Sequence, residues 1–159
     1  MTRIGVTGHR NIPDAVYGLA RDTLTAAVRE HPGPVEALSS LAAGADQLFA
    51  EVALDCGAEL TVVTPCAGYE VSFAGADELD RYHRLLDRAH THVRMDFPEV
   101  SDQAFYAAGV YVADHSDLIL AVWDGRPARG HGGTADIVEY ARRTGTPVTV
   151  IWQPGVERD

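Results

Sequence analysis

The sequence has 159 residues, of which 46% are hydrophobic and 23% are charged, so it is long enough to bury the core of one domain. Its formal net charge is −10. This charge argues against a broad nucleic-acid-binding face, which needs clustered basic side chains, and we predict no nucleic-acid partner. No apolar run approaches the roughly 18 residues of a membrane span, and no secretory leader precedes the first predicted strand. We therefore expect a soluble, cytoplasmic protein with no membrane partner.

The first half of the chain alternates short β-branched runs with helical patterns. The pattern predicts strands at 3–7, 34–39 and 59–63 and helices at 13–31 and 45–55. The first of these helices is stopped by the Pro-Gly-Pro run at 32–34. The second ends before Gly57, a glycine in the usual position after a helix C-terminus. Each strand is thus followed by a helix, as in βα units.

The second half continues the alternation. The pattern predicts helices at 77–89, 102–115 and 134–144 and strands at 92–95, 118–123 and 148–152. Residues 118–123 are almost entirely apolar, as expected of a central strand that is covered on both faces. Residues 65–75 are expected to form an irregular loop. We predict a single Rossmann-like, three-layer α/β domain with a mostly parallel sheet over residues 1–153, followed by a C-terminal tail at 154–159.

Two glycine-rich turns follow predicted strands, GVTGHR at residues 5–10 and GHGGT at 130–134. In doubly wound sheets, ligands bind beyond the carboxyl ends of the strands, where the N–H groups of helix starts point at them. Glycines let a phosphate approach the backbone, and Thr134 could cap the following helix or donate its hydroxyl. Each turn alone could equally be a tight turn, but together they predict a site for a phosphate-bearing ligand.

Further candidates lie near the same predicted edge of the sheet. Asp46 either stabilises the dipole of the helix it begins or approaches a ligand's sugar, and Asp124 follows the predicted central strand directly. Because the chain contains no lysine, the candidate cations are Arg10, Arg126 and Arg129. The candidate ligand-binding residues are Gly8, His9, Arg10, Ser39, Gly44, Asp46, Asp124, Gly130, Gly132, Gly133 and Thr134.

Several known site types do not fit the sequence. The first turn lacks the G-x-G-x-x-G spacing, and the second has His131 where a P-loop has its lysine. A dinucleotide oxidoreductase and a P-loop NTPase are therefore disfavoured, and we predict no bound cofactor. His90 and His92 lack a third ligand nearby in sequence, and Cys56 and Cys66 match no metal or redox spacing. We predict no metal site and reduced thiols.

Four segments together resemble the SLOG superfamily: GVTGHR at 5–10, LAAGAD at 41–46, SDLILAVWDG at 116–125 and GGTAD at 132–136. This superfamily includes LOG-type phosphoribohydrolases and DprA-type DNA-processing proteins, and the nearest match is a small bacterial branch with the TGHR and GGTAD patterns. The resemblance runs nearly end to end. It implies a Rossmann-like domain that binds a nucleotide or nucleotide-derived ligand, commonly as a homodimer or larger homo-oligomer.

The resemblance leaves the activity open. LOG enzymes carry P-G-G-x-G-T-x-x-E, in which the threonine loop grips phosphate and the glutamate, with an arginine, supports cleavage of the base–ribose bond; here Ile137 stands at the position of the glutamate. We expect binding of a nucleotide or nucleotide-derived phosphate ligand, with Tyr69 or Phe73 covering the base. The alternative is hydrolysis of a nucleoside 5′-monophosphate to base and ribose 5-phosphate. Its candidate catalytic residues are Asp136, Glu139 and Arg126.

Overall fold

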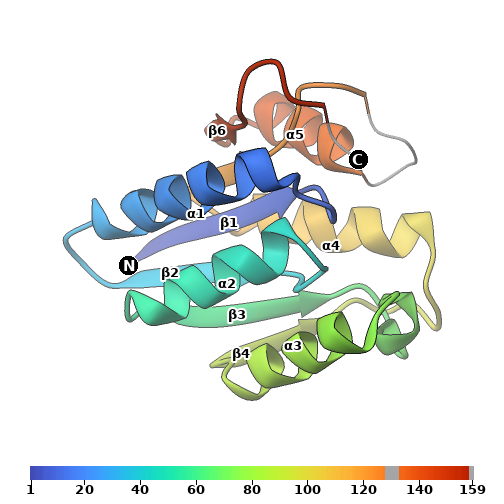
Figure 1. Cartoon of the computed structure of the whole chain (residues 1–159). Helices are drawn as coiled ribbons and strands as arrows, with labels where there is room; N and C mark the ends of the chain where they lie inside the picture. Colours follow the sequence, from blue (N-terminus) through green and yellow to red (C-terminus); the bar gives the residue numbers. More distant parts are fainter. Residues whose placement is uncertain (128–132, 158–159) are drawn as a thin grey trace.

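The apolar, β-branched runs of the sequence form one parallel sheet in the computed structural model, which describes residues 1–127 and 133–157 (Figure 1). The strands are β1 (Thr2–Gly8), β2 (Val35–Ser39), β3 (Glu59–Thr64), β4 (Thr91–Arg94), β5 (Leu118–Val122) and β6 (Val148–Ile151). Their order is β4-β3-β2-β1-β5-β6, and every neighbouring pair is parallel. The predicted fold class is confirmed.

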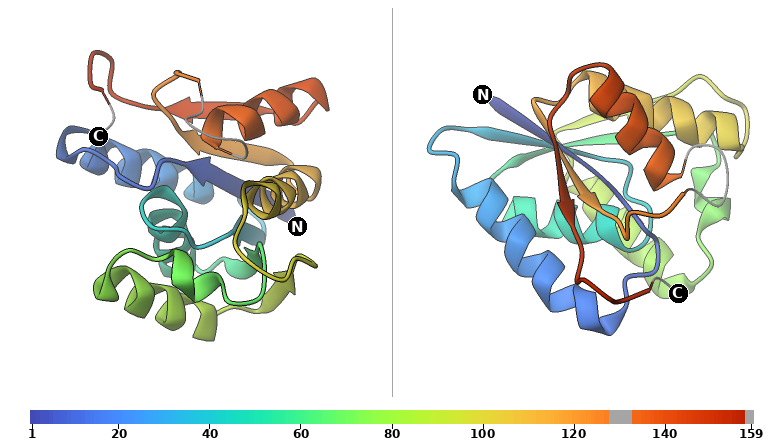
Figure 2. Two further views of the ribbon diagram at one scale, coloured as in Figure 1. Left: turned by 90° about the vertical axis from the view of Figure 1, so that its right-hand side faces the viewer. Right: turned by 90° about the horizontal axis from the view of Figure 1, so that it is seen from above.

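Helices cover both faces of this sheet (Figures 1 and 2). They are α1 (Asp14–Arg29), α2 (Ala45–Asp55), α3 (Ala76–Asp87), α4 (Asp102–Asp114) and α5 (Thr134–Arg143), with a short 3₁₀ turn, η1 (Tyr69–Ser72). The first three helices lie on one face, and α4 and α5 lie on the other. The edge strands of the sheet are β4 and β6.

Apolar side chains from each helix layer form the core. On the face of α1 and α2, Val16, Leu24, Leu48 and Phe49 are buried with the sheet, as their helical spacing predicts. The opposite face is smaller and includes Ile119. Between α4 and α5, Gly109 leaves room for the side chain of Ile137, since a Cβ on this glycine would overlap with the Ile137 side chain.

The strand order reverses between β1 and β5. Gly8 at the end of β1 pairs with Val122 at the end of β5, so the two strands end at the same level. From there the chain continues to α1 on one face and to α5 on the other. This topological switch point is where doubly wound sheets bind their ligands.

The C-terminal segment folds back onto the domain after β6. The indole N–H of Trp152 donates to the carbonyl of Val156 at 2.7 Å, and Val156 packs against the larger core cluster. Glu157 forms an exposed ion pair with Arg126 at 2.9 Å. Within residues 1–127 and 133–157, none of the helices has the length and apolar character that a membrane crossing requires.

Candidate functional site

His9 and Asp124 meet at the switch point. The His9 N–H donates to the carbonyl of Val122 at 3.1 Å, which extends the β1–β5 ladder by one residue. His9 Nε2 lies 3.2 Å from Asp124 Oδ1 and also 3.2 Å from the Asp124 backbone N–H nitrogen. The two side chains are 9% and 2% exposed. The structure therefore brings together two residues that lie 115 positions apart in the sequence.

The protonation of His9 decides which of these contacts is a hydrogen bond. A neutral ring with an unprotonated Nε2 accepts the Asp124 N–H, whereas a protonated Nε2 donates to the Asp124 carboxylate. The ring also meets the Trp152 ring edge to face, with centroids 5.4 Å apart. His9 is thus held by β5 on one side and by the segment after β6 on the other.

Two of the predicted site glycines have a packing role. A Cβ on Gly8 would overlap with the side chain of Ala45, and a Cβ on Gly44 would overlap with the backbone of His9 and Arg10. Gly44 also has a φ of +81°, in the region that favours glycine. Ala45 N–H donates to the His9 carbonyl at 3.1 Å. These contacts fix the loop after β1 against the first turn of α2.

This loop presents Arg10 at the carboxyl edge of the sheet. The guanidinium carbon of Arg10 lies 5.1 Å from the centre of the Phe105 ring, within the range of a cation–π contact. Phe105 lies in the first turns of α4, so Arg10 spans from the loop after β1 to the opposite helix layer. Nothing in the sequence around Phe105 points to this role, because its partner lies far away along the chain.

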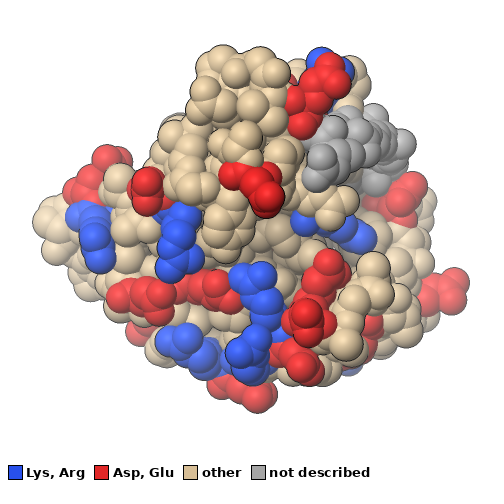
Figure 3. Space-filling model, viewed as in Figure 1, with Lys and Arg blue, Asp and Glu red and all other residues tan. Residues whose placement is uncertain are grey.

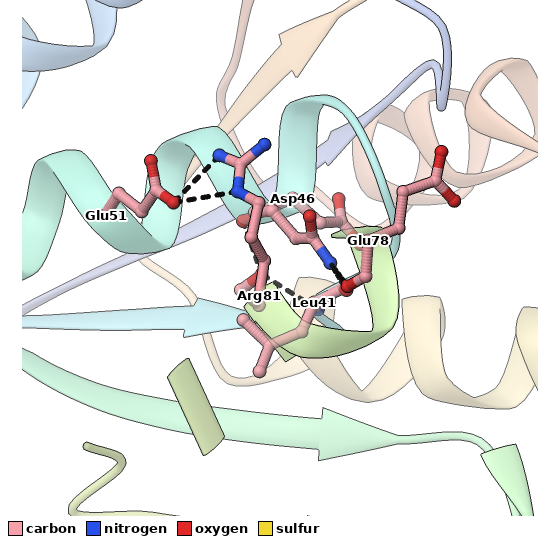
Figure 4. A network of polar contacts seen from close by, with 7 residues as sticks. Leu41, Asp46, Glu51, Glu78 and Arg81 are labelled. Carbon is pink, nitrogen blue, oxygen red and sulfur yellow. Dashed lines mark hydrogen bonds and ion pairs between the residues drawn. The ribbon is translucent and has the colours of Figure 1, made fainter. Parts of the chain in front are cut away.

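Asp46 lies in the first turn of α2 (Figure 4). It is buried, with 9% of its surface exposed. Burial raises its pKa from the ordinary 3.8 to about 7, while the Ala42 N–H and the Arg10 charge act in the opposite direction. Burial also raises the pKa of the Tyr69 hydroxyl, and the Asp46 charge adds to this shift. Arg10, Asp46 and Tyr69 therefore form one electrostatically connected group.

Ser39 serves the turn between β2 and α2. Its hydroxyl donates to the Asp46 carbonyl at 2.9 Å and accepts the Leu41 N–H at 3.1 Å. Leu41 adopts a positive φ of 57°, which this hydrogen bond and its complete burial stabilise. The Gln47 side chain donates to the Leu41 and Glu78 carbonyls and ties the turn to α3 (Figure 4). Ser39, one of the predicted ligand-binding residues, is therefore buried and stabilises the conformation of this turn.

The second predicted turn is described only from Gly133 onward. Gly130 and Gly132 lie outside the described residues, as do Arg129 and His131. Thr134 begins α5 and is largely buried. The start of α5, where its first backbone N–H groups lie, follows β5 at the carboxyl edge of the sheet, as predicted.

The candidate catalytic residues take different positions. Asp136 and Glu139 line an open hollow of about 700 Å³ beside α5, together with Trp123 and Gly125; His9, Arg10 and Asp46 do not line it. Glu139 lies 3.9 Å from Arg143. Arg126 pairs with Glu157 and donates its backbone N–H to Asp124 Oδ1 at 3.0 Å. Ile137 is buried against α4.

Charges of both signs are mixed over the face that carries α1, α2 and α3 (Figure 3). Arg81 pairs with Glu51 at 2.8 Å across α3 and α2 (Figure 4), and Arg3 lies 3.6 Å from Glu36.

The part of the chain that the structure describes holds no group of three or more His, Cys, Asp or Glu side chains that could bind a metal.

Comparisons with known proteins agree with this architecture. No family model and no curated protein matches the sequence. Among solved structures, DNA processing protein A (DprA) from Streptococcus pneumoniae matches with a TM-score of 0.72 at 16% identity, over 98% of this chain and 52% of that one. DprA from Helicobacter pylori matches with a TM-score of 0.71 at 15% identity, over 99% and 68% of the two chains.

The molybdenum cofactor carrier protein from Chlamydomonas reinhardtii also matches, with a TM-score of 0.58 at 17% identity, over 94% of this chain and 75% of that one. At these identities the matches show the fold, which is the Rossmann-like fold that the sequence resemblance implied. The chain spans about half the length of the pneumococcal DprA.

These comparisons correct one prediction. The net charge led us to exclude a nucleic-acid partner, but the Helicobacter pylori DprA, which shares the fold over 99% of this chain, has a described mode of single-stranded DNA binding. The exclusion was wrong because binding depends on the charges at the contact surface, whereas net charge averages over the whole molecule.

Proposed function

We propose that the chain binds a nucleotide or a nucleotide-derived phosphate ligand at the carboxyl edge of the sheet between β1 and β5. The observation that carries this proposal is the reversal of strand order between these two strands, where doubly wound sheets bind ligands. The sequence resemblance to the SLOG superfamily, whose fold the chain has, favours the same ligand class.

Arg10 is the proposed partner of the phosphate. A guanidinium can contact an aromatic ring and still bind a phosphate through its N–H groups, which suits the position of Arg10 over Phe105. The first turn of α5 with Thr134 has backbone N–H groups at the same edge of the sheet, where they could bind a second part of the ligand, and the predicted contribution of Gly130 and Gly132 belongs to this turn. His9 and Asp124 would shape the floor of the site between β1 and β5.

The proposal is tested with a ligand panel. Thermal-shift and calorimetric titrations with nucleoside mono- and diphosphates, NAD and ADP-ribose are expected to identify at least one ligand. Arg10→Gln is expected to weaken its binding at least about tenfold, since it removes a charge-assisted contact. Arg21→Gln, which removes the same charge from the exposed side of α1, is the matched control and should bind like the wild type. Silence of the wild type across the panel would contradict the proposal.

Single-stranded DNA is the second candidate ligand. It is favoured by the match to two DprA structures over nearly the whole chain. A nucleotide unit of a DNA strand offers the same phosphate and base as a free nucleotide, so the same edge of the sheet could bind either. A fluorescent oligothymidine, titrated in parallel with the mononucleotides, separates the two candidates.

The hydrolase alternative finds less support in the geometry. The position that carries the glutamate in LOG enzymes is Ile137, which is buried between α4 and α5 and packs against Gly109. Asp136 and Glu139 line a hollow that does not include His9 or Arg10. Ligand binding without LOG-type turnover is therefore the function that we propose.

A further inference from the structure

A carboxyl group lies buried next to the proposed phosphate partner. Gly44 packs against the backbone of Arg10, and Asp46 follows two residues later in the first turn of α2. The Ser39 hydroxyl binds the Asp46 carbonyl and holds this turn in place. The Arg10 charge acts on this carboxyl group, which is almost excluded from water, so an anion bound at Arg10 would change the electrostatic field at Asp46.

Few charges act on this carboxyl group. Among residues 1–127 and 133–157, Arg10, from the loop after β1, is the cation whose charge lowers the pKa of Asp46, and the Asp46 charge raises the pKa of the Tyr69 hydroxyl, from η1, which stays protonated. From α3, Arg81 is paired with Glu51, and Glu78 contacts α2 through its carbonyl. The buried positions of α1, which packs on α2, are Val16, Ala20, Leu24 and Val28. Burial has the largest effect on the pKa of Asp46, and the Arg10 charge partly opposes it, so a change in the field at Arg10 changes how easily Asp46 is ionised.

We propose that binding of an anionic ligand at Arg10 is coupled to the uptake of one proton by Asp46. This inference rests on the proposed function. A phosphate that engages Arg10 takes away part of the positive potential that favours the Asp46 carboxylate, and it adds negative charge beside it. The carboxylate then takes a proton from solvent and becomes a neutral carboxyl group, so the bound complex contains one negative charge fewer.

The coupling has a definite direction with pH. The pKa of Asp46 is about 7 in the ligand-free protein, so the group is mostly ionised at pH 8 and mostly neutral at pH 6. Because proton uptake and ligand binding favour each other reciprocally, affinity for an anion is expected to fall as pH rises. We expect a loss of about threefold to tenfold between pH 6 and 8.5.

The test measures protons directly. ADP-ribose is a suitable probe, because its pyrophosphate keeps a constant charge between pH 6 and 8.5; if AMP alone binds, it is used above pH 7.2. Titration calorimetry at pH 7.5 in Tris and in HEPES, whose ionisation enthalpies differ, should give an uptake of a substantial fraction of one proton. Equal binding enthalpies in the two buffers, with a pH-independent affinity, would overturn the coupling while leaving the proposed function intact.

Asp46→Asn identifies the group. This variant keeps a hydrogen-bond acceptor for the Ala42 N–H but cannot titrate, so its binding of the probe, whatever the affinity, should show neither proton uptake nor pH dependence. Asp55→Asn, at the exposed C-terminal end of the same helix, should retain both. Proton uptake that persists in Asp46→Asn would assign the proton to another group. Absence of binding by the wild type in every buffer would instead contradict the proposed function.

Discussion

At the scale of single residues, the burial of the Asp46 carboxyl group lowers the stability of the fold at neutral pH. A carboxyl group that folding removes from water is less easily ionised, and its pKa of about 7 exceeds the ordinary 3.8. Between these two values the unfolded chain has lost the proton and the folded chain still holds it. The free energy of unfolding therefore falls as pH rises through this window, and the full penalty is present above pH 7.

Replacing this carboxyl group should therefore stabilise the protein. Asp46→Asn is expected to have a higher free energy of unfolding than the wild type. This gain should be about 2 to 3 kcal/mol larger at pH 8 than at pH 5, because the raised pKa of Asp46 destabilises the wild type by the equivalent of about two pKa units between these pH values. Urea unfolding of both proteins at the two pH values measures this difference. The same stability change at both pH values would show that Asp46 titrates in the folded protein as it does in the unfolded chain.

At the scale of elements, the loop after β1 depends on the start of α2. Gly44 has a φ of +81°, and its missing side chain leaves room for the backbone of His9 and Arg10. Gly57 has a similar φ of +84°, but a Cβ on this glycine would have no neighbouring atom within 4 Å. The two glycines thus share the backbone requirement and differ in the close approach of a neighbouring element.

The pair Gly44→Ala and Gly57→Ala separates these two effects. Gly57→Ala is expected to cost about 1 kcal/mol through backbone strain alone. Gly44→Ala should cost at least about 2 kcal/mol more, since its Cβ would overlap with backbone that cannot move cheaply. Chemical denaturation of both variants gives the comparison. Equal losses would mean that the loop shifts freely and that the position of Arg10 does not depend on α2.

Elements were easier to predict than the contacts between them. Every predicted strand and helix is present with small shifts at its ends, because period-two and helical patterns are local properties of the sequence. The expected irregular loop at 65–75 contains η1. The contact of Arg10 with Phe105 and the burial of Asp46 arise from three-dimensional packing, so no local sequence pattern predicts them. The sequence predicts Gly8 and Gly44 as ligand-binding residues, whereas the structure shows that Gly8 packs against Ala45 and Gly44 against Arg10.

At the scale of the whole molecule, net charge was a poor guide to partners. The chain carries 13 basic and 23 acidic residues, and both signs are interspersed on the face in Figure 3. Such a surface repels a polyanion at long range, whereas a short contact with a few phosphates depends on local groups such as Arg10.

The excess of acidic over basic side chains predicts how the chain would bind single-stranded DNA. Fluorescence anisotropy of a labelled oligothymidine should show weak binding at 50 mM salt, and the plot of log affinity against log salt should have a shallow slope, because each neutralised phosphate of a single strand contributes about −0.7. Arg10→Gln should reduce both affinity and slope, and Arg21→Gln should change neither. Equal losses in the two variants would indicate attraction to general surface charge, and unchanged anisotropy at every protein concentration would contradict the DNA candidate while leaving the mononucleotide proposal to its own titrations.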